Sequence, residues 1–359
     1  MTVRARNLAL LPVLAAAVLL FVLIAWRPSP ASWKLKKVRI PPGSGYPEIV
    51  RILTGNGVLR FPAAFRVLVT VTFTGKMLKH GEYVFPAPPS AYELWRKIRS
   101  GDVAKYPVTV PEGANLHDIA RILGEMELAD PASFLLAATS SGLANRLDIP
   151  SDTAEGFLFP DTYLLVKDMG VEAILRIMVR EFHQKFTSEM EREAVAKGLT
   201  IRQVVTIASI IEKETGVEAE KPLISSVIHL RLRRGMPLQM DPTVIYGLKK
   251  FDGNLTKKDL RTRNRYNTYL NPGLPPGPIS NPGLSSLMAA LHPADTNYLY
   301  FVSRNDGSHQ FSETLAEHNR AVRAYQTKGG GKQPAKKQDS AGSKEKGTAT
   351  PPLRRQEPS

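Results

Sequence analysis

Two glutamates stand at the end of an otherwise aliphatic run, IASIIEKETG, at residues 207–216. A carboxylate in apolar surroundings is costly unless it is paired, hydrogen-bonded or protonated. Glu212 and Glu214 are therefore either solvated charges at a helix end or acids placed for chemistry. A carboxyl group that keeps its proton near neutral pH can act as a general acid, for instance toward a glycosidic oxygen.

The residues before these glutamates predict one helix over 200–216. Thr200 and Gln203 have the spacing of a capping box at its start. Gly216 suits the position just past its end. The helix must therefore carry both acids in its last turn.

On such a helix the two acids lie at different margins of the aliphatic face. Glu214 follows three isoleucines by seven, four and three positions, which places it at the edge of that face (Ile207, Ile210, Ile211). Glu212 lies toward the other margin, and this spacing favours Glu214 only weakly as the chemical acid.

Three influences are expected to raise the pKa of Glu214: apolar surroundings, the negative end of the helix dipole and the like charge of Glu218. These would keep its proton in place near neutral pH. From the helix alone, the alternative of a surface acid paired with Lys213 or Lys221 stays open.

Composition excludes several classes of chemistry. The 359 residues contain no cysteine, and the seven histidines lack the HExxH spacing of a metal site. We find neither a GxGxxG nor a Walker A loop, nor a GxSxG elbow. The sequence therefore predicts no metal and no cofactor.

The net charge of +15 is placed at the ends of the chain. Residues 327–359 hold eight Lys/Arg against three Asp/Glu, and we expect this basic tail to be disordered. Other cations flank an apolar N-terminal segment (Arg4, Arg6, Arg27, Lys34, Lys36, Lys37, Arg39). This distribution suits membrane surfaces and anionic polymers, and we predict no nucleic-acid partner.

The segment 8–26 is 19 residues long without a charge, about the length that crosses a bilayer. No clear signal-peptidase site follows it, so we predict an uncleaved single-pass anchor. Residues 1–7 would be a cytoplasmic tail, 27–34 a linker, and the remainder an extracytoplasmic body.

An internal repeat follows the linker. VRIPPGSGYPEIVRIL at 38–53 aligns with VTVPEGANLHDIARIL at 108–123, and each predicts a strand, a Pro-x-Gly turn and an amphipathic helix. Residues 81–101 predict a further strand and helix. Such small modules could be recognition modules or structural spacers, and both readings stay open.

The rest of the chain predicts helices joined by loops, so the fold class is α+β. Residues 124–198 read as helical except for EGFLFPDTYLL at 155–165. Its aromatic side chains (Phe157, Phe159, Tyr163) could stack on a ligand or belong to the core.

Several ordered motifs resemble those of the YceG-like family, the MltG-type endolytic murein transglycosylases. They are EGFLFPDTY (155–163), ASIIEKET (208–215), LQMDPTVIYG (238–247), YNTY (266–269), GLPPGPISNPG (273–283), NYLYFV (297–302) and HQFSETLAEHN (309–319). The resemblance covers about 35–325. It implies one N-terminal transmembrane helix, a LysM-like subdomain at 35–105, and a YceG-like catalytic region at 106–326 with its core at 200–326.

The resemblance also implies the catalytic residue and the reaction. It places the acid at Glu214, followed by Thr215, with Glu212 as the fallback. A single acid would protonate the oxygen between N-acetylmuramic acid and N-acetylglucosamine, and then take the proton of the C6 hydroxyl to form a 1,6-anhydro end.

Further family motifs are expected to shape the glycan groove. Gln239, Asp241 and Thr243 could bind sugar hydroxyls or acetamido groups, although Asp241 could instead be a helix N-cap. The ring faces and amide of YNTY could bind sugars or pack a loop (Tyr266, Asn267, Tyr269). We also count Glu212 among the candidate substrate-binding residues.

The partners implied are peptidoglycan glycan strands, the plasma membrane and, by family, peptidoglycan synthases. The enzyme would face outward from the plasma membrane and terminate or trim nascent strands. Two alternatives stay open: a non-catalytic LysM-like peptidoglycan-binding scaffold, and a muramidase that uses water.

Overall fold

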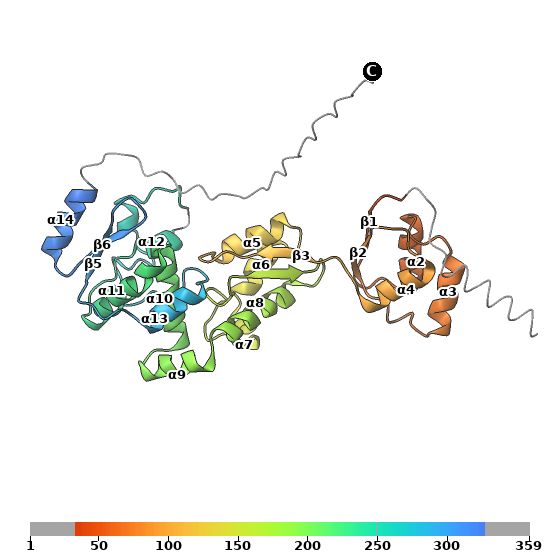
Figure 1. Ribbon diagram of the computed structural model, residues 1–359, viewed down its shortest axis with the longest axis horizontal. Helices are drawn as coiled ribbons and strands as arrows, with labels where there is room; N and C mark the ends of the chain where they lie inside the picture. Colours follow the sequence, from red (N-terminus) through yellow and green to blue (C-terminus); the bar gives the residue numbers. More distant parts are fainter. Residues whose placement is uncertain (1–32, 249, 327–359) are drawn as a thin grey trace, which may run out of the picture.

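A computed structural model describes residues 33–248 and 250–326, and its fold is mixed α+β as predicted. The predicted anchor at 8–26, the tail at 1–7 and the basic tail at 327–359 lie outside the described residues. Figure 1 shows three units in a row, each with one two-stranded antiparallel sheet.

The first unit pairs β1 (Lys36–Ile40) with β2 (Gly81–Phe85). Three helices accompany this sheet: α2 (Tyr46–Gly55), α3 (Pro62–Val71) and α4 (Ala91–Ser100). Alternate strand residues, such as Val38 and Ile40, enter a small separate hydrophobic core. This unit lies at the right-hand end of Figure 1.

The second unit pairs β3 (Tyr106–Thr109) with β4 (Thr162–Leu165). Its helices are α5 (Leu116–Glu125), α6 (Pro131–Ala138), α7 (Ser141–Arg146) and α8 (Val171–Lys185). The internal repeat is confirmed, because β1–α2 and β3–α5 have the predicted strand–turn–helix form. Each turn holds a glycine at positive φ, at Gly43 and Gly113, where a side chain would be strained.

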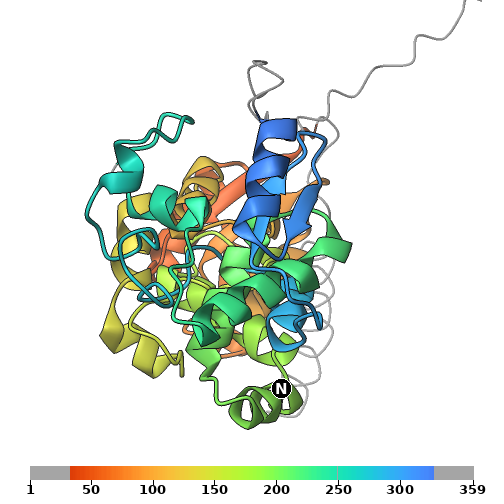
Figure 2. The ribbon, with the colours of Figure 1, turned by 90° about the vertical axis from the view of Figure 1, so that its left-hand side faces the viewer.

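The third unit is built around α10 (Ile201–Glu214), whose residues from 204 to 211 are all buried. Its other elements are α9 (Ser188–Ala196), α11 (Lys221–Arg233), α12 (Asp241–Gly247), α13 (Leu284–Leu291), β5 (Tyr300–Ser303), β6 (His309–Ser312) and α14 (Leu315–Tyr325), with short 3-10 turns at Glu218–Glu220 and Asp259–Arg261. Figure 2 shows α14 beside β5 and β6 at the end of the molecule.

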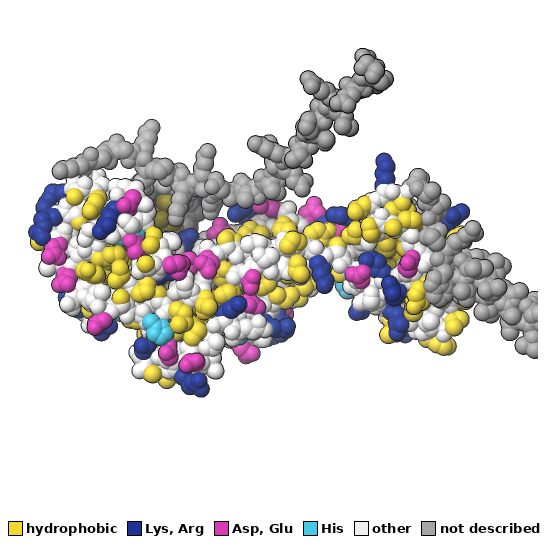
Figure 3. Space-filling view, in the orientation of Figure 1, with side chains coloured by type: hydrophobic (Ala, Val, Ile, Leu, Met, Phe, Trp, Pro, Cys, Tyr) yellow, Lys and Arg dark blue, Asp and Glu magenta, His cyan; other side chains and the backbone are white. Residues whose placement is uncertain are grey.

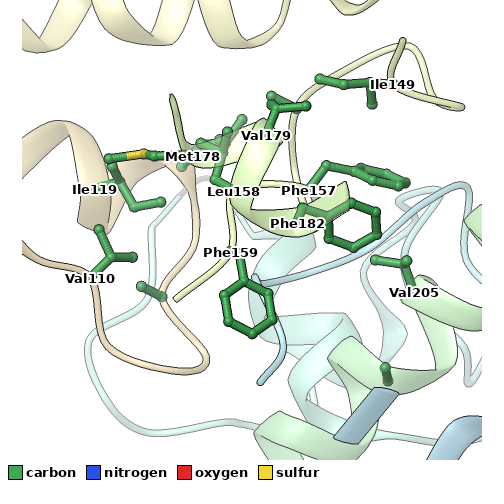
Figure 4. Packing of buried hydrophobic residues seen from close by; sticks show 14 of the residues in the cluster. Val110, Ile119, Ile149, Phe157, Leu158, Phe159, Met178, Val179, Phe182 and Val205 are labelled. Atoms are coloured by element: carbon green, nitrogen blue, oxygen red, sulfur yellow. The ribbon is translucent and has the colours of Figure 1, made fainter. Parts of the chain in front are cut away.

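One hydrophobic core runs through the second and third units. Phe157 and Phe159 are buried in it, and the ring of Phe157 meets that of Phe182 edge-on at 5.0 Å (Figure 4). Tyr163 is also buried. Of the two readings of these aromatics, the core reading is confirmed.

Among the described residues, no single helix has the length and apolarity to cross a membrane. Helices α9 and α10 together have the required length and apolarity, but the chain bends by 96° between them.

Candidate active site

The C-terminal end of α10 opens into a cavity of about 430 Å³. Its walls come from the loop before α12, from β5, and from one side of α14 along its whole length. The polar and aromatic residues that line it are Glu214, Arg231, Gln239, Asp241, Tyr269, Tyr300, Phe301, Ser303, His309, His318 and Gln326. A carboxyl group among aromatic walls is suited to chemistry on a sugar.

Helix α10 starts and ends where the sequence predicts. Thr200 and Gln203 form the capping box, with both reciprocal hydrogen bonds present. At the other end Thr215 is extended and buried, and its hydroxyl accepts from the N–H of Val217 at 3.0 Å. Thr215 is the C-cap, so Gly216 occupies the predicted C′ position, although it does not adopt the left-handed conformation common there. The threonine turn directly follows Glu214, which lines the cavity.

Burial, and secondarily the charge of Asp241, raises the pKa of Glu214 to about 8. The predicted direction is confirmed, but the neighbouring acid is not Glu218. The Glu218 carboxylate is exposed and pairs with Lys221 at 2.7 Å, which holds its pKa below the ordinary value. Glu214 therefore keeps its proton at neutral pH while facing a cavity.

Asp241 and Tyr269 face Glu214 as a hydrogen-bonded pair. The Tyr269 hydroxyl donates to Asp241 Oδ1 at 2.6 Å. Asp241 is the first residue of α12 and Met240 is its N-cap, so the N-cap alternative for Asp241 is wrong. The Asp241 carboxylate, with Oδ1 bonded to Tyr269, lines the cavity together with Glu214.

Gln239 lines the same cavity with its side chain exposed and its backbone at a φ of 53°. Its N–H donates to the Thr268 carbonyl at 3.2 Å, which holds this left-handed conformation. Strained backbone at a non-glycine residue is often found where a side chain must be presented to a ligand.

Thr243, Asn267 and Tyr266 are engaged within the fold. The buried Thr243 hydroxyl meets the Met240 carbonyl at 2.7 Å and the Thr268 hydroxyl at 2.8 Å. The buried Asn267 amide donates to two loop carbonyls and accepts from the Tyr269 N–H at 2.9 Å. These contacts, with Tyr266 packed on Tyr246, support the loop-packing reading and position Tyr269.

Glu212 faces away from the cavity, toward the start of α13. Its Oε2 accepts from the Gly283 N–H at 3.0 Å and from the Ser286 hydroxyl at 2.7 Å, with Lys221 Nζ at 3.8 Å. A carboxylate at a helix N-terminus satisfies free N–H groups and complements the dipole. Glu212 thus joins α10 to α13, and the structure gives it a supporting place rather than a sugar contact.

Replacement of Glu212 by Gln should therefore affect folding more than chemistry. We expect Glu212→Gln to lower the free energy of unfolding by about 1–3 kcal/mol, since a charged acceptor is lost beside the buried Lys221. The turnover number on glycan should stay within about threefold of wild type. Urea unfolding and initial rates test this, and a large loss of turnover with unchanged stability would contradict it.

Arg231 is a site residue that the sequence reading missed. Its guanidinium is buried, donates to the carbonyls of Leu299 and Leu238 at 2.7 Å, and lies over the Tyr300 ring at 5.2 Å. It therefore ties the cavity loop to β5. A signal existed, because Arg231 follows Ile224, Val227 and Ile228 by seven, four and three positions and so falls on the apolar face of α11.

Loss of this arginine should destabilise the third unit. We expect Arg231→Met to cost about 3 kcal/mol of unfolding free energy, because buried carbonyls lose their donors. The exposed Arg234→Met is the matched control and should change stability by less than about 0.5 kcal/mol. Equal unfolding midpoints for the two variants would refute this role for Arg231.

A second carboxyl with a raised pKa lies outside the cavity lining. Glu155 is buried, accepts from the Leu116 N–H at 3.2 Å and the Tyr246 hydroxyl at 2.9 Å, and burial raises its pKa to about 7. It connects α5 of the second unit to α12 of the third, and its place in EGFLFPDTY did not reveal this role.

Comparison with known proteins places this chain in one family. The model of the YceG-like family matches residues 38–324, and the chain belongs to this family. The crystal structure of a YceG-like protein from Listeria monocytogenes superposes with a TM-score of 0.57 and 31% identity, over 81% of this chain and 100% of that one.

Two curated relatives carry the name endolytic murein transglycosylase. The protein of Bacillus subtilis (strain 168) is 33% identical over 307 residues, which cover 80% of this chain and 84% of that protein. The protein of Streptococcus pneumoniae serotype 2 (strain D39 / NCTC 7466) is 28% identical over 324 residues, or 81% of this chain and 58% of its own length.

Proposed function

We propose that this protein is an endolytic peptidoglycan lytic transglycosylase with Glu214 as its catalytic acid. The observation that carries the proposal is a glutamic acid with a pKa of about 8 at the wall of a cavity lined by tyrosines and phenylalanine. The names of the relatives support the substrate, which is murein.

In the proposed reaction Glu214 donates its proton to the oxygen that links N-acetylmuramic acid to N-acetylglucosamine, and that glycosidic bond breaks. The substrate's own N-acetyl carbonyl stabilises the anomeric carbon. Glu214, now a carboxylate, accepts the proton of the C6 hydroxyl as its oxygen attacks the anomeric carbon. The 1,6-anhydro ring closes and the protonated acid is restored, so no water is consumed.

A muramidase that uses water is the second candidate, and the position of Asp241 favours it. Hydrolysis of a glycoside commonly needs two carboxyl groups, and Asp241 supplies a second one in the same cavity. In the transglycosylase reading Asp241 instead keeps Glu214 protonated and accepts a hydrogen bond from Tyr269.

Digestion of purified sacculi separates these functions. If the proposal holds, cleavage within the strands produces glycan fragments that carry new 1,6-anhydro-N-acetylmuramic acid ends. Mass spectrometry of the products should detect these ends. Reducing ends would establish the muramidase. Binding without any product would instead support a non-catalytic scaffold.

We further propose the cellular setting implied by the chain's first residues. Residues 8–26 would anchor the protein in the plasma membrane with its N-terminus in the cytoplasm, residues 35–105 would be a LysM-like subdomain, and the catalytic region would face the wall near peptidoglycan synthases. The uncharged segment and the strand–helix repeat support this. Protease accessibility in intact spheroplasts, with a C-terminal epitope, tests the orientation.

A further inference from the structure

Helix α3 is apolar on two faces, and one of them has no partner in the described structure. Ala64, Phe65 and Val69 enter the core of the first unit. On the outer face Val67 is 44% exposed and Val71 is 70% exposed. Exposed apolar side chains that are neighbours on one helix face form a patch, and such a patch indicates a missing partner.

The exposed apolar strip continues past the end of α3. Phe73 is 89% exposed and Met77 is 52% exposed. Phe73 sits at the C′ position of α3 with a φ of 51°, where its N–H donates to the Thr70 carbonyl while that of Thr74 donates to the Val69 carbonyl. Glycine is the usual residue of this motif. A strained phenylalanine with its ring in solvent gains nothing for the fold.

Cations surround this strip. Residues 49–81 contain five Lys/Arg and no Asp/Glu. Beside Met77 a groove of about 640 Å³ is lined by basic side chains and by Trp95 (Lys76, Lys79, His80, Arg96, Arg99). In Figure 3 hydrophobic and basic side chains adjoin along the lower edge of the first unit.

The positive charge belongs to this unit and not to the body of the chain. Residues 35–105 hold 12 Lys/Arg and four Asp/Glu, whereas residues 106–326 hold 24 and 26. A uniform excess would favour solubility or nonspecific binding, but a basic unit on a near-neutral body indicates a surface of opposite charge.

We propose that α3 and the segment 72–79 dock on an anionic lipid bilayer, with Val71, Phe73 and Met77 in the acyl boundary. Aliphatic and aromatic tips rimmed by Lys and Arg are the chemistry of an interfacial contact. A glycan site would need ring faces beside hydrogen-bonding partners, and in this strip Phe73 supplies a ring whereas Val71 and Met77 supply no polar group. The inference rests on the proposed anchor at 8–26, which would hold this unit beside the membrane, and it goes beyond that anchor.

The absence of cysteine allows single labels in the full chain. Val71→Cys and, as control, Leu136→Cys would carry an environment-sensitive fluorophore, since Leu136 is equally exposed but lies on α6 of the second unit. The labelled chains are reconstituted in vesicles of phosphatidylcholine with 30% phosphatidylglycerol. We expect spin-labelled lipid to quench position 71 about threefold more than position 136.

Two variants, each made in the chain labelled at position 71, test the apolar and the electrostatic contributions to docking. Phe73→Gly introduces the residue preferred at C′, so folding should be kept while the quenching falls to the level of position 136. Lys76→Glu with Lys79→Glu should do the same, and the exposed Arg234→Glu, as matched control, should not. In the chain labelled at position 71 without these further substitutions, high salt and vesicles of pure phosphatidylcholine should each weaken the quenching.

Each outcome is decisive. Equal quenching at positions 71 and 136 in a chain that floats with vesicles overturns the docking surface and leaves the anchor intact. Failure to float overturns both. Shielding of position 71 by soluble peptidoglycan fragments in detergent, without quenching in vesicles, assigns the strip to glycan instead. Sacculus digestion reports on the catalytic proposal separately.

Discussion

Glu214→Gln should lower the rate of glycan cleavage by about 10³-fold or more, because the amide cannot donate a proton to the leaving oxygen or accept one from the C6 hydroxyl. Glutamine matches glutamic acid in shape, so the cavity and its walls should be unchanged. Release of soluble fragments from labelled sacculi measures the loss. Binding to sacculi should be retained.

Stability supplies an independent readout for the same variant. Because the pKa of Glu214 is raised from 4.5 to about 8, the folded protein holds a proton that the unfolded chain releases between these values. The stability contributed by this site therefore falls as the pH rises from about 4.5 to about 8. Glu214→Gln removes this titration and should be more stable than wild type at pH 8 by about 1–3 kcal/mol, with little difference near pH 4.5.

Glu212→Gln is the matched control for both readouts. It lies two residues away on the same helix, but it caps α13 and should lose stability while keeping turnover. If Glu212→Gln were inactive and Glu214→Gln retained wild-type cleavage, the catalytic role would pass to Glu212.

Local patterns predicted the elements of this chain well. The capping box at Thr200, the isoleucine spacing before Glu214 and the strand–turn–helix repeat are properties of neighbouring residues, and each appears in the structure. Even the position of Arg231 on an apolar helix face was readable, although its carbonyl partners were not.

The relations that define the site depend on chain segments far apart, and local patterns could not predict them. Glu212 accepts hydrogen bonds from Gly283 and Ser286, which lie 71 and 74 residues further along the chain. The strands β5 and β6 were absorbed into a prediction of helices and loops because each has four residues, too few for a clear alternation. Without them the cavity wall opposite Glu214 could not be anticipated.

The acid that acts on Glu214 shows the same limit. Glu218 is near in sequence but turned to Lys221, whereas Asp241 is distant in sequence and shares the cavity. Helix geometry predicted a raised pKa, and only the packing of α12 against the end of α10 identified the neighbouring charge.

Asp241→Asn should move the alkaline limb of the pH–rate profile to lower pH. Glu214 must be protonated to act as an acid, so activity is lost as the pH rises through its pKa of about 8. Removal of the Asp241 charge takes away one of the two causes that raise this pKa, while burial, the larger cause, remains. We expect kcat/KM to fall on its alkaline side about one pH unit earlier, and activity at pH 8 to drop about fivefold.

Tyr269→Phe is the control that separates charge from hydrogen bonding. It removes the hydroxyl that donates to Asp241 but leaves the carboxylate in the cavity. Its alkaline limb should therefore stay close to that of the wild type, whereas Asp241→Asn shifts it. The same comparison bears on the reaction itself, because a muramidase that used Asp241 to activate water would lose reducing-end products in Asp241→Asn at every pH. If the alkaline limb of the pH–rate profile shifts in Asp241→Asn while the product stays the 1,6-anhydro form, Asp241 raises the pKa of Glu214 and does not activate water.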